Sequence, residues 1–288
     1  MSLELLSVEA VRQRMAHNAN PFTIIDARDR AAFTACHIPG AIFMGWEEWV
    51  EAAPQDADPQ LQQEGWWGVL DDPQALVERI ALRGVSSDQP IVVYADGQGS
   101  MGRDGRIAWM LLYLGAQSVA LLDGGWTQWL LEGGPTSTAP STPSPVRFTL
   151  SVQEQRRVRF PAIRAAYFAG NMPLLVDTRS KDEFDGNEPD YYLPRKGHLS
   201  SAALFPFADL YDSNGLFVSR EQYLESATTL APATQPFVTY CEVGVRASST
   251  ALLHELYTGT VVPVFDGSLM QWSLDRDLPM ESKLDLVE

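Results

Sequence analysis

The sequence predicts an α/β protein built from two similar domains, each a mostly parallel sheet covered by helices on both faces. Three observations predict this class. At 288 residues, the chain is long enough for two domains that each bury a core. Within each half, short β-branched runs alternate with amphipathic segments, an alternation typical of parallel sheets under helices. Finally, the two halves repeat one series of motifs in the same order, which indicates an internal duplication.

The predicted strands are short apolar runs that lack the length of a helix. Helices are expected at 106–114 and 246–257, because each segment is amphipathic and ends beside a glycine, Gly115 or Gly259, in the C-cap position. The strands are expected at residues 24–25, 91–93 and 119–122 of the first half and at 174–176, 237–239 and 261–264 of the second.

Four pairs of motifs carry the duplication, and a connector separates the two series. The tract GPTSTAPSTPSP at residues 134–145 supplies no apolar surface to bury and should run extended. We therefore expect a first domain at residues 1–134, a Pro/Ser/Thr linker at 135–146 and a second domain at 147–288. The motif pairs are Asp26-Ala27-Arg28 with Asp177-Thr178-Arg179, His37-Ile38-Pro39-Gly40-Ala41 with His198-Leu199-Ser200-Ser201-Ala202, Ile91-Val92-Val93-Tyr94 with Phe237-Val238-Thr239-Tyr240, and Asp123-Gly124-Gly125-Trp126-Thr127-Gln128-Trp129 with Asp266-Gly267-Ser268-Leu269-Met270-Gln271-Trp272.

Composition excludes several classes of function. The net charge of -16 argues against a nucleic-acid partner, because such binding needs basic surface that releases counterions. The first 16 residues lack the apolar core of a signal peptide, and no stretch reaches the length of a membrane helix, so we expect a cytoplasmic protein without a membrane partner. The two cysteines, Cys36 and Cys241, and four scattered histidines form no disulfide framework and no metal motif. We expect neither a metal nor another cofactor.

Cys241 is the candidate nucleophile because of its place between a strand and a helix. It follows the strand at 237–239 and begins the sequence Cys241-Glu242-Val243-Gly244-Val245-Arg246. In open α/β sheets, the working site lies beyond the carboxyl ends of the strands. The N-terminus of the next helix, with Arg246 nearby, should favour the thiolate over the thiol near neutral pH. Taken alone, a buried and inert core thiol is an equally good interpretation.

The motifs together resemble those of the tandem-domain rhodaneses. The resemblance rests on the two D-x-R segments, on His37-Ile38-Pro39-Gly40-Ala41, on the C-E-V-G-V-R loop and on the paired D-G motifs, and it covers nearly the whole chain. In that family the C-terminal domain carries the cysteine and the N-terminal domain is a catalytically silent copy. Here Ala95 takes the place of Cys241, and the loop at 96–104 is longer and rich in glycine.

The resemblance implies a role for each site residue. Cys241 would accept sulfur as a persulfide, and the loop amides would hold the anionic part of the donor. Asp177, with Arg179, would support the loop or tie its strand in place. Cys36 and His198 are expected to be structural. The loop amides are those of Glu242, Val243, Gly244, Val245 and Arg246, with Arg246 also offering its side chain to the donor.

The loop departs from both donor classes of that family. Members that use thiosulfate often have basic residues after the cysteine, and members that use 3-mercaptopyruvate usually have a Cys-Gly-Ser-Gly-Val-Thr-like loop, whereas this chain has Glu242 and Val243. The run at 182–186 is acidic where relatives place an arginine that binds the carboxylate of mercaptopyruvate. Arg195 or Lys196 could replace that arginine as an anion contact. Thiosulfate is therefore the expected donor, by elimination.

Three classes of function stay open at this point. A thiosulfate sulfurtransferase would pass sulfur from a small anionic donor to Cys241 and then to cyanide, a thiol or a thioredoxin-like protein. A 3-mercaptopyruvate sulfurtransferase is a variant of the same class. A cysteine-based phosphatase of similar fold would need a loop one residue longer, with its arginine seventh and not sixth. A noncatalytic persulfide carrier or interaction module has the same sequence features as the enzyme.

Overall fold

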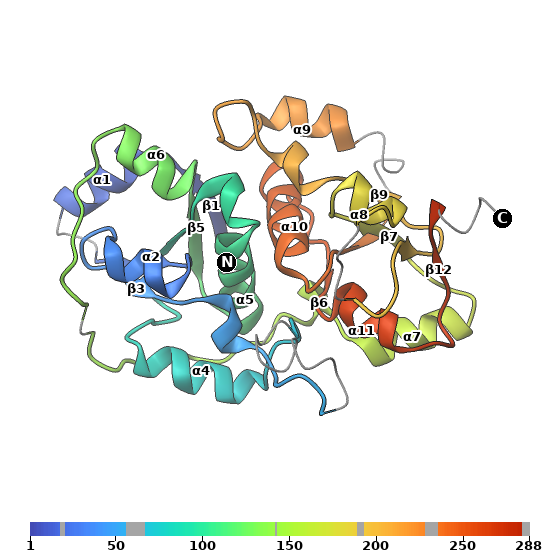
Figure 1. Cartoon of the computed structure of the whole chain (residues 1–288). Helices are drawn as coiled ribbons and strands as arrows, with labels where there is room; N and C mark the ends of the chain where they lie inside the picture. Colours follow the sequence, from blue (N-terminus) through green and yellow to red (C-terminus); the bar gives the residue numbers. More distant parts are fainter. Residues whose placement is uncertain (18–20, 56–66, 142, 189–192, 228–235, 284–288) are drawn as a thin grey trace. The chain divides into compact units, whose positions relative to one another are not determined.

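The computed structural model describes residues 1–17, 21–55, 67–141, 143–188, 193–227 and 236–283 (Figure 1). These residues form two compact units. One unit contains Met1–Trp49, Asp71–Gln153 and Tyr211–Phe217, and the other contains Val50–Leu70, Glu154–Leu210 and Val218–Glu288. Each unit therefore includes one short segment from the other half of the sequence. The domain boundaries expected at residues 134 and 147 stay predictions.

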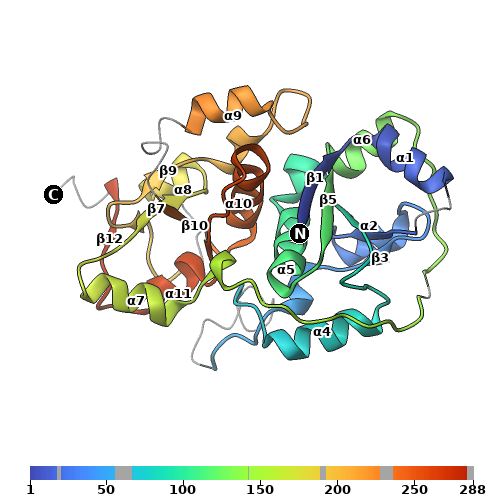
Figure 2. The ribbon, with the colours of Figure 1, turned by 180° about the vertical axis from the view of Figure 1, so that it is seen from behind.

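The first unit is a five-stranded parallel sheet in the order β1-β5-β4-β2-β3. Figure 2 shows β1 beside β5, where the N-terminal strand extends the sheet. Helices α1 and α6 pack on one face through a shared apolar core, and α5 lies against β4 and β5. The elements are β1 (Ser2–Leu6), α1 (Val8–Ala16), β2 (Thr23–Asp26), α2 (Arg30–Ala35), β3 (Ile42–Phe43), α4 (Pro73–Leu82), β4 (Ile91–Tyr94), α5 (Arg103–Leu114), β5 (Ser118–Leu122) and α6 (Gly125–Leu131), with 3-10 helices at Trp46–Trp49 and Gly97–Ser100.

The second unit repeats this topology, with a five-stranded parallel sheet in the order β6-β11-β10-β7-β9. In a separate antiparallel pair, β12, which follows α11 in the chain, pairs with β8. The elements are β6 (Arg157–Val158), α7 (Phe160–Phe168), β7 (Leu174–Asp177), α8 (Lys181–Asp185), β8 (His198–Leu199), β9 (Ala203–Leu204), α9 (Arg220–Ala227), β10 (Phe237–Tyr240), α10 (Val245–Thr258), β11 (Val264–Phe265), α11 (Ser268–Leu274) and β12 (Met280–Glu281), with 3-10 helices at Glu154–Arg156 and Phe207–Leu210.

The predicted fold class is confirmed, with differences at the ends of elements. Gly115 and Gly259 end α5 and α10 in the left-handed conformation, as expected of C-caps. The strand expected at 261–264 is shorter, because Pro263 has no N–H to donate and β11 begins only at Val264. The short outer strands β1 and β6 were not predicted, since neither is a clear β-branched run.

The duplication extends to single hydrogen bonds in the D-x-R motifs. In the first unit, the Arg28 guanidinium donates to both carboxylate oxygens of Asp26, at 2.6 to 3.2 Å. In the second, Arg179 donates to Asp177 in the same way, at 2.7 to 3.1 Å. All four side chains are buried, at 3% exposure or less. Each pair ends a central strand and fixes the loop that follows it.

The tract expected to be a linker lies along the first unit. The Trp129 Nε1 donates to the Pro135 carbonyl at 3.0 Å, and the His37 and Ser137 backbones exchange two hydrogen bonds. The Ser141 hydroxyl donates to the Ala41 carbonyl at 2.7 Å. The described residues of the segment are thus fixed to the first unit by backbone and side-chain hydrogen bonds. Among the residues the structure describes, no helix is long and apolar enough to cross a bilayer.

The exchanged segments meet the two matching D-G motifs. In the second unit, the Leu70 amide donates to the carboxylate of Asp266 at 3.0 Å. In the first, the Phe217 amide donates to the carboxylate of Asp123 at 2.9 Å. Because Asp123 and Asp266 begin equivalent motifs, the exchange is part of the duplicated architecture. Each half of the sequence completes the unit formed mainly by the other.

Candidate active site

Cys241 stands at the carboxyl end of β10, at the start of a tight loop that leads into α10. Its side chain is buried, at 1% exposure. Gly244 closes the loop with a φ of +79°, a left-handed conformation that favours glycine, and α10 begins at the next residue. The thiol thus lies at a strand–loop–helix junction, as predicted. The loop is short, because β10 ends at Tyr240 and α10 begins at Val245.

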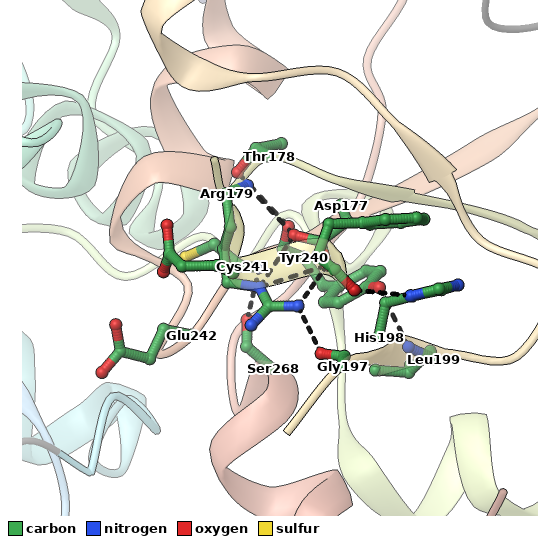
Figure 3. Close-up of polar contacts among 12 residues, drawn as sticks. Asp177, Thr178, Arg179, Gly197, His198, Leu199, Tyr240, Cys241, Glu242 and Ser268 are labelled. Atoms are coloured by element: carbon green, nitrogen blue, oxygen red, sulfur yellow. Dashed lines mark hydrogen bonds and ion pairs between the residues drawn. The ribbon is translucent and has the colours of Figure 1, made fainter. Parts of the chain in front are cut away.

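The first turn of α11 fixes the backbone around Cys241. The Cys241 amide donates to the Ser268 hydroxyl at 3.2 Å (Figure 3). The Cys241 and Glu242 carbonyls accept hydrogen bonds from the amides of Leu269 and Met270, at 3.2 and 2.9 Å. Ser268 itself has a φ of +48° and donates its hydroxyl proton to a backbone carbonyl. The sequence shows the motif that begins at Asp266 only as a repeat and does not predict its contact with the loop.

The loop amides form the part of the site that suits an anion. In the described part of the chain, the amides of Val243, Gly244, Val245 and Arg246 have no acceptor. This follows from helix geometry, since the first turn of a helix leaves its N–H groups without partners inside the helix. These donors, together with the positive end of the helix dipole, can hold negative charge at the sulfur of Cys241 or on a bound donor.

The predicted arginine of the loop, Arg246, is held by a carboxylate that the sequence reasoning missed. Both terminal nitrogens of its guanidinium donate to the Glu183 carboxylate, at 2.6 and 2.7 Å. Both side chains are buried, at 8% and 7% exposure. Burial alone raises the pKa of Glu183, but the hydrogen bonds and charge of Arg246 outweigh it and hold the pKa at about 2. The fork expected to bind a donor is thus occupied by the protein's own carboxylate.

Glu183 lies on α8, and local sequence explains how it is positioned. Ser180 caps this helix, accepting from the Glu183 amide at 3.2 Å, while the Glu183 carboxylate accepts from the Ser180 amide at 2.9 Å. This reciprocal capping box needs the spacing S-x-x-E, which is visible in the sequence. The same carboxylate therefore ends a helix and pairs with the loop arginine.

Glu242 adds a second negative charge to the loop. Its carboxylate lies 3.4 Å from a terminal nitrogen of Arg246 and is 15% exposed. Burial lowers the pKa of Arg246, but hydrogen bonding to Glu183 and the charges of Cys241, Glu183 and Glu242 raise it. Arg246 is therefore close enough to the thiol to sense its charge, and two carboxylates face the one guanidinium.

The other predicted site residues are placed around the loop and not in it. The Asp177–Arg179 pair lies next to the loop, since Asp177 pairs with Tyr240 in the sheet. The Arg179 guanidinium also donates to the Gly197 carbonyl at 2.7 Å (Figure 3), so the pair ties β7 to the segment before β8. His198 stacks on Phe184 with ring centroids 3.5 Å apart, a packing contact.

Arg195, predicted as an anion contact, binds backbone carbonyls at the C-terminal end of α11. Its guanidinium donates to four backbone carbonyls, at 2.7 to 3.0 Å. These carbonyls belong to the last turn of the helix and to the chain beyond it, where acceptors lack partners inside the helix. The arginine thus caps a helix whose first turn holds Cys241. Its acceptors are those of Trp272, Ser273, Asp275 and Leu278.

A glycine from the first half of the sequence packs against the loop. Gly68, in the exchanged segment, has a φ of +78°, and a Cβ placed on it would lie 2.4 Å from the Val243 carbonyl oxygen. Beside it, Arg157 pairs with Asp266 at 2.8 Å and donates to the Leu70 carbonyl at 3.0 Å. The exchanged segment therefore packs against the loop although it is distant from it in the sequence.

The equivalent loop in the first unit lacks the reactive groups. Ala95 takes the place of Cys241, and a longer loop separates it from α5. The N-cap glycine of α5, Gly102, matches Gly244, so that Asp104 stands where Arg246 stands in the second unit. Asp104 is buried, and burial raises its pKa to about 6. Over residues 1–17, 21–55, 67–141, 143–188, 193–227 and 236–283, no cluster of three or more metal-ligating side chains occurs.

Comparison with known proteins assigns the family. A family model of the rhodanese-like domain matches residues 7–132 and 164–275. The chain belongs to the rhodanese-like family and carries two copies of its domain, which confirms the resemblance seen in the motifs.

The relatives that resemble the chain over most of its length are sulfurtransferases. A thiosulfate sulfurtransferase of Mus musculus is 29% identical over 266 residues, covering 88% of this chain and 82% of the relative. A 3-mercaptopyruvate sulfurtransferase of Homo sapiens is 28% identical over 282 residues, covering 92% and 88%. Among solved structures, an anaerobic ergothioneine biosynthesis enzyme from Chlorobium limicola matches with a TM-score of 0.81 at 20% identity, covering 97% of this chain and 70% of that one. That last similarity concerns the fold.

Proposed function

We propose that this protein is a sulfurtransferase that carries sulfane sulfur as a persulfide on Cys241, with thiosulfate as the donor. The observation that carries the proposal is the loop itself, in which a lone thiol begins a turn lined by the unpartnered amides of 243–246. Such amides stabilise a thiolate before the reaction and a persulfide anion after it. The relatives named above act on thiosulfate or 3-mercaptopyruvate, which supports this class.

The reaction proceeds in two displacements on sulfur. The Cys241 thiolate attacks the outer sulfur of thiosulfate, a new S–S bond forms, and the bond to the sulfonate sulfur breaks. Sulfite leaves with that electron pair. An acceptor, cyanide or a thiolate, then attacks the outer sulfur of the persulfide, and the Cys241 sulfur leaves as the thiolate. No net oxidation occurs, so the enzyme needs no redox partner for the cycle.

Thiosulfate is proposed over 3-mercaptopyruvate because no free arginine faces the loop from α8. That helix presents the Glu183 carboxylate, which already pairs with Arg246. A 2-oxo acid carboxylate would meet this acidic side chain, whereas the oxygens of thiosulfate can be held by the loop amides alone.

Intact mass spectrometry tests the proposal directly. Incubation with thiosulfate should add one sulfur atom to the wild type and none to Cys241→Ser, because a serine hydroxyl neither ionises near neutral pH nor holds a persulfide. Parallel incubation with 3-mercaptopyruvate identifies the donor. If neither donor adds sulfur to the wild type, the proposed function is wrong.

A further inference from the structure

The side chains around the Cys241 loop carry a net negative charge, which is unusual for a site that binds an anionic donor. Arg246 is the cation of the loop itself, and both terminal nitrogens of its guanidinium are occupied by Glu183. The Glu242 carboxylate then lies 3.4 Å from the same guanidinium. One positive and two negative side chains leave the loop with a net negative charge before the thiolate is counted.

Among the described residues, the cations on the elements beside the loop are paired with carboxylates, as Arg157 is with Asp266. The Arg179 guanidinium, two residues beyond the end of β7, is paired with Asp177. From α8 the loop is approached by Glu183, and the charges of Glu183 and Arg246 are both felt at Glu188, a further carboxyl group on that side. The loop amides are the positive groups that remain for an anion, and they act at short range.

We propose that Glu242 is a specificity-determining residue that disfavours acceptor thiols with a negatively charged substituent and directs the persulfide sulfur of Cys241 to thiol acceptors that are neutral or positively charged. The inference rests on the proposed function. Glu242 is the residue next to the cysteine, and its carboxylate is 15% exposed, so its charge is weakly screened. An acceptor thiolate must enter the loop that carries this carboxylate, and the charge on the rest of the acceptor decides how strongly it is repelled.

In the transfer step, the acceptor thiolate attacks the outer sulfur of the persulfide. A new S–S bond forms between acceptor and outer sulfur, the bond from the Cys241 sulfur breaks, and its electron pair returns to Cys241 as thiolate. The chemistry is the same for every thiol. A charged group elsewhere on the acceptor changes the transfer rate only through its attraction to or repulsion from Glu242. At a separation of about 4 Å, each unit charge should change the rate by about fivefold.

The test uses three small thiols of similar size: cysteamine, 2-mercaptoethanol and 3-mercaptopropionate, with a positive, neutral and negative substituent. Enzyme loaded with thiosulfate and desalted is mixed with each thiol, and loss of the added sulfur is followed by intact mass. Comparing variant with wild type removes the intrinsic reactivity of each thiol. Glu242→Gln should raise the rate with 3-mercaptopropionate relative to cysteamine by up to about 25-fold, since the two substituents differ by two unit charges, and it should lower the KM for thiosulfate more than it changes kcat.

Two matched variants control the experiment. Glu242→Asp keeps the charge and should keep the wild-type ratio, whereas Glu221→Gln removes an exposed charge on α9 and should also leave it unchanged. If Glu242→Gln keeps the wild-type ratio, Glu242 does not select the acceptor. If the wild type takes no sulfur from either donor, the proposed function fails and this inference fails with it, so the two failures are distinguished by the loading step.

Discussion

Glu183→Gln should destabilise the protein by about 3 kcal/mol at pH 7, and the effect should shrink as the pH falls. The substitution keeps the size of the side chain and one hydrogen-bond acceptor, but it removes the charge that pairs with Arg246. Since the two side chains are 7% and 8% exposed, solvent screens the lost interaction little.

The magnitude follows from the pKa of Glu183, which is lowered from 4.5 to about 2, with burial opposing the change and Arg246 driving it. Each pKa unit corresponds to about 1.4 kcal/mol, which gives about 3 kcal/mol at neutral pH. Because the folded-state pKa is depressed, this stabilisation is fully present above the unfolded-state pKa of 4.5 and is lost as the pH falls through about 2. At pH 3 about 1.5 kcal/mol should remain.

Urea unfolding of wild type and variant at pH 7, 4 and 3 measures this difference, with Glu221→Gln as the exposed control. The control should stay within about 0.5 kcal/mol of the wild type at every pH. A loss below about 1 kcal/mol at pH 7, or a loss that does not change with pH, would refute the reasoning, since a buried pair of this geometry should contribute more.

Three further outcomes follow from the structure. Cys36→Ser should keep thiocyanate formation from thiosulfate and cyanide, because Cys36 lies outside the loop, while Cys241→Ser should abolish it; comparable loss in both would mean that the nucleophile is misassigned. Gly68→Ala should lower that activity while leaving the secondary structure seen by circular dichroism intact, because its Cβ would lie 2.4 Å from the Val243 carbonyl oxygen and must displace the loop. Asp104→Asn should stabilise the protein by about 3 kcal/mol above pH 7 and by little near pH 4, because burial raises the pKa of this carboxyl from 3.8 to about 6 and its ionisation costs folded-state free energy; thermal unfolding across that range checks the sign.

The sequence predicted the parts of the molecule that depend on local order. The strand–loop–helix around Cys241, the glycine caps and the common topology of the two halves all follow from motifs that are contiguous in the chain. The repeat made these predictions stronger, because each motif had a second copy. What the sequence could predict was therefore where the thiol lies, between β10 and α10.

The partners of the site could not be predicted, because they come from distant parts of the chain. Glu183 is recognisable as the N3 residue of a capping box, yet nothing local shows that its carboxylate also binds Arg246, 63 residues away. Gly68 lies in the other half of the sequence. Arg195 looks like a free cation until its four carbonyl acceptors are seen.

The first half of the chain lacks three residues of the candidate site together. At the positions equivalent to Cys241, Arg246 and Glu183, the first half of the chain has Ala95, Asp104 and Ala32.

The structural pair that ends the central strand, by contrast, is present in both halves, as Asp26 with Arg28 and as Asp177 with Arg179. A residue that only the fold requires is expected in both units, because both contain the same sheet. The thiol, the arginine and its carboxylate are absent together from the first unit, so the common fold does not require them, and their joint presence in the second unit is what the proposed chemistry at Cys241 would need.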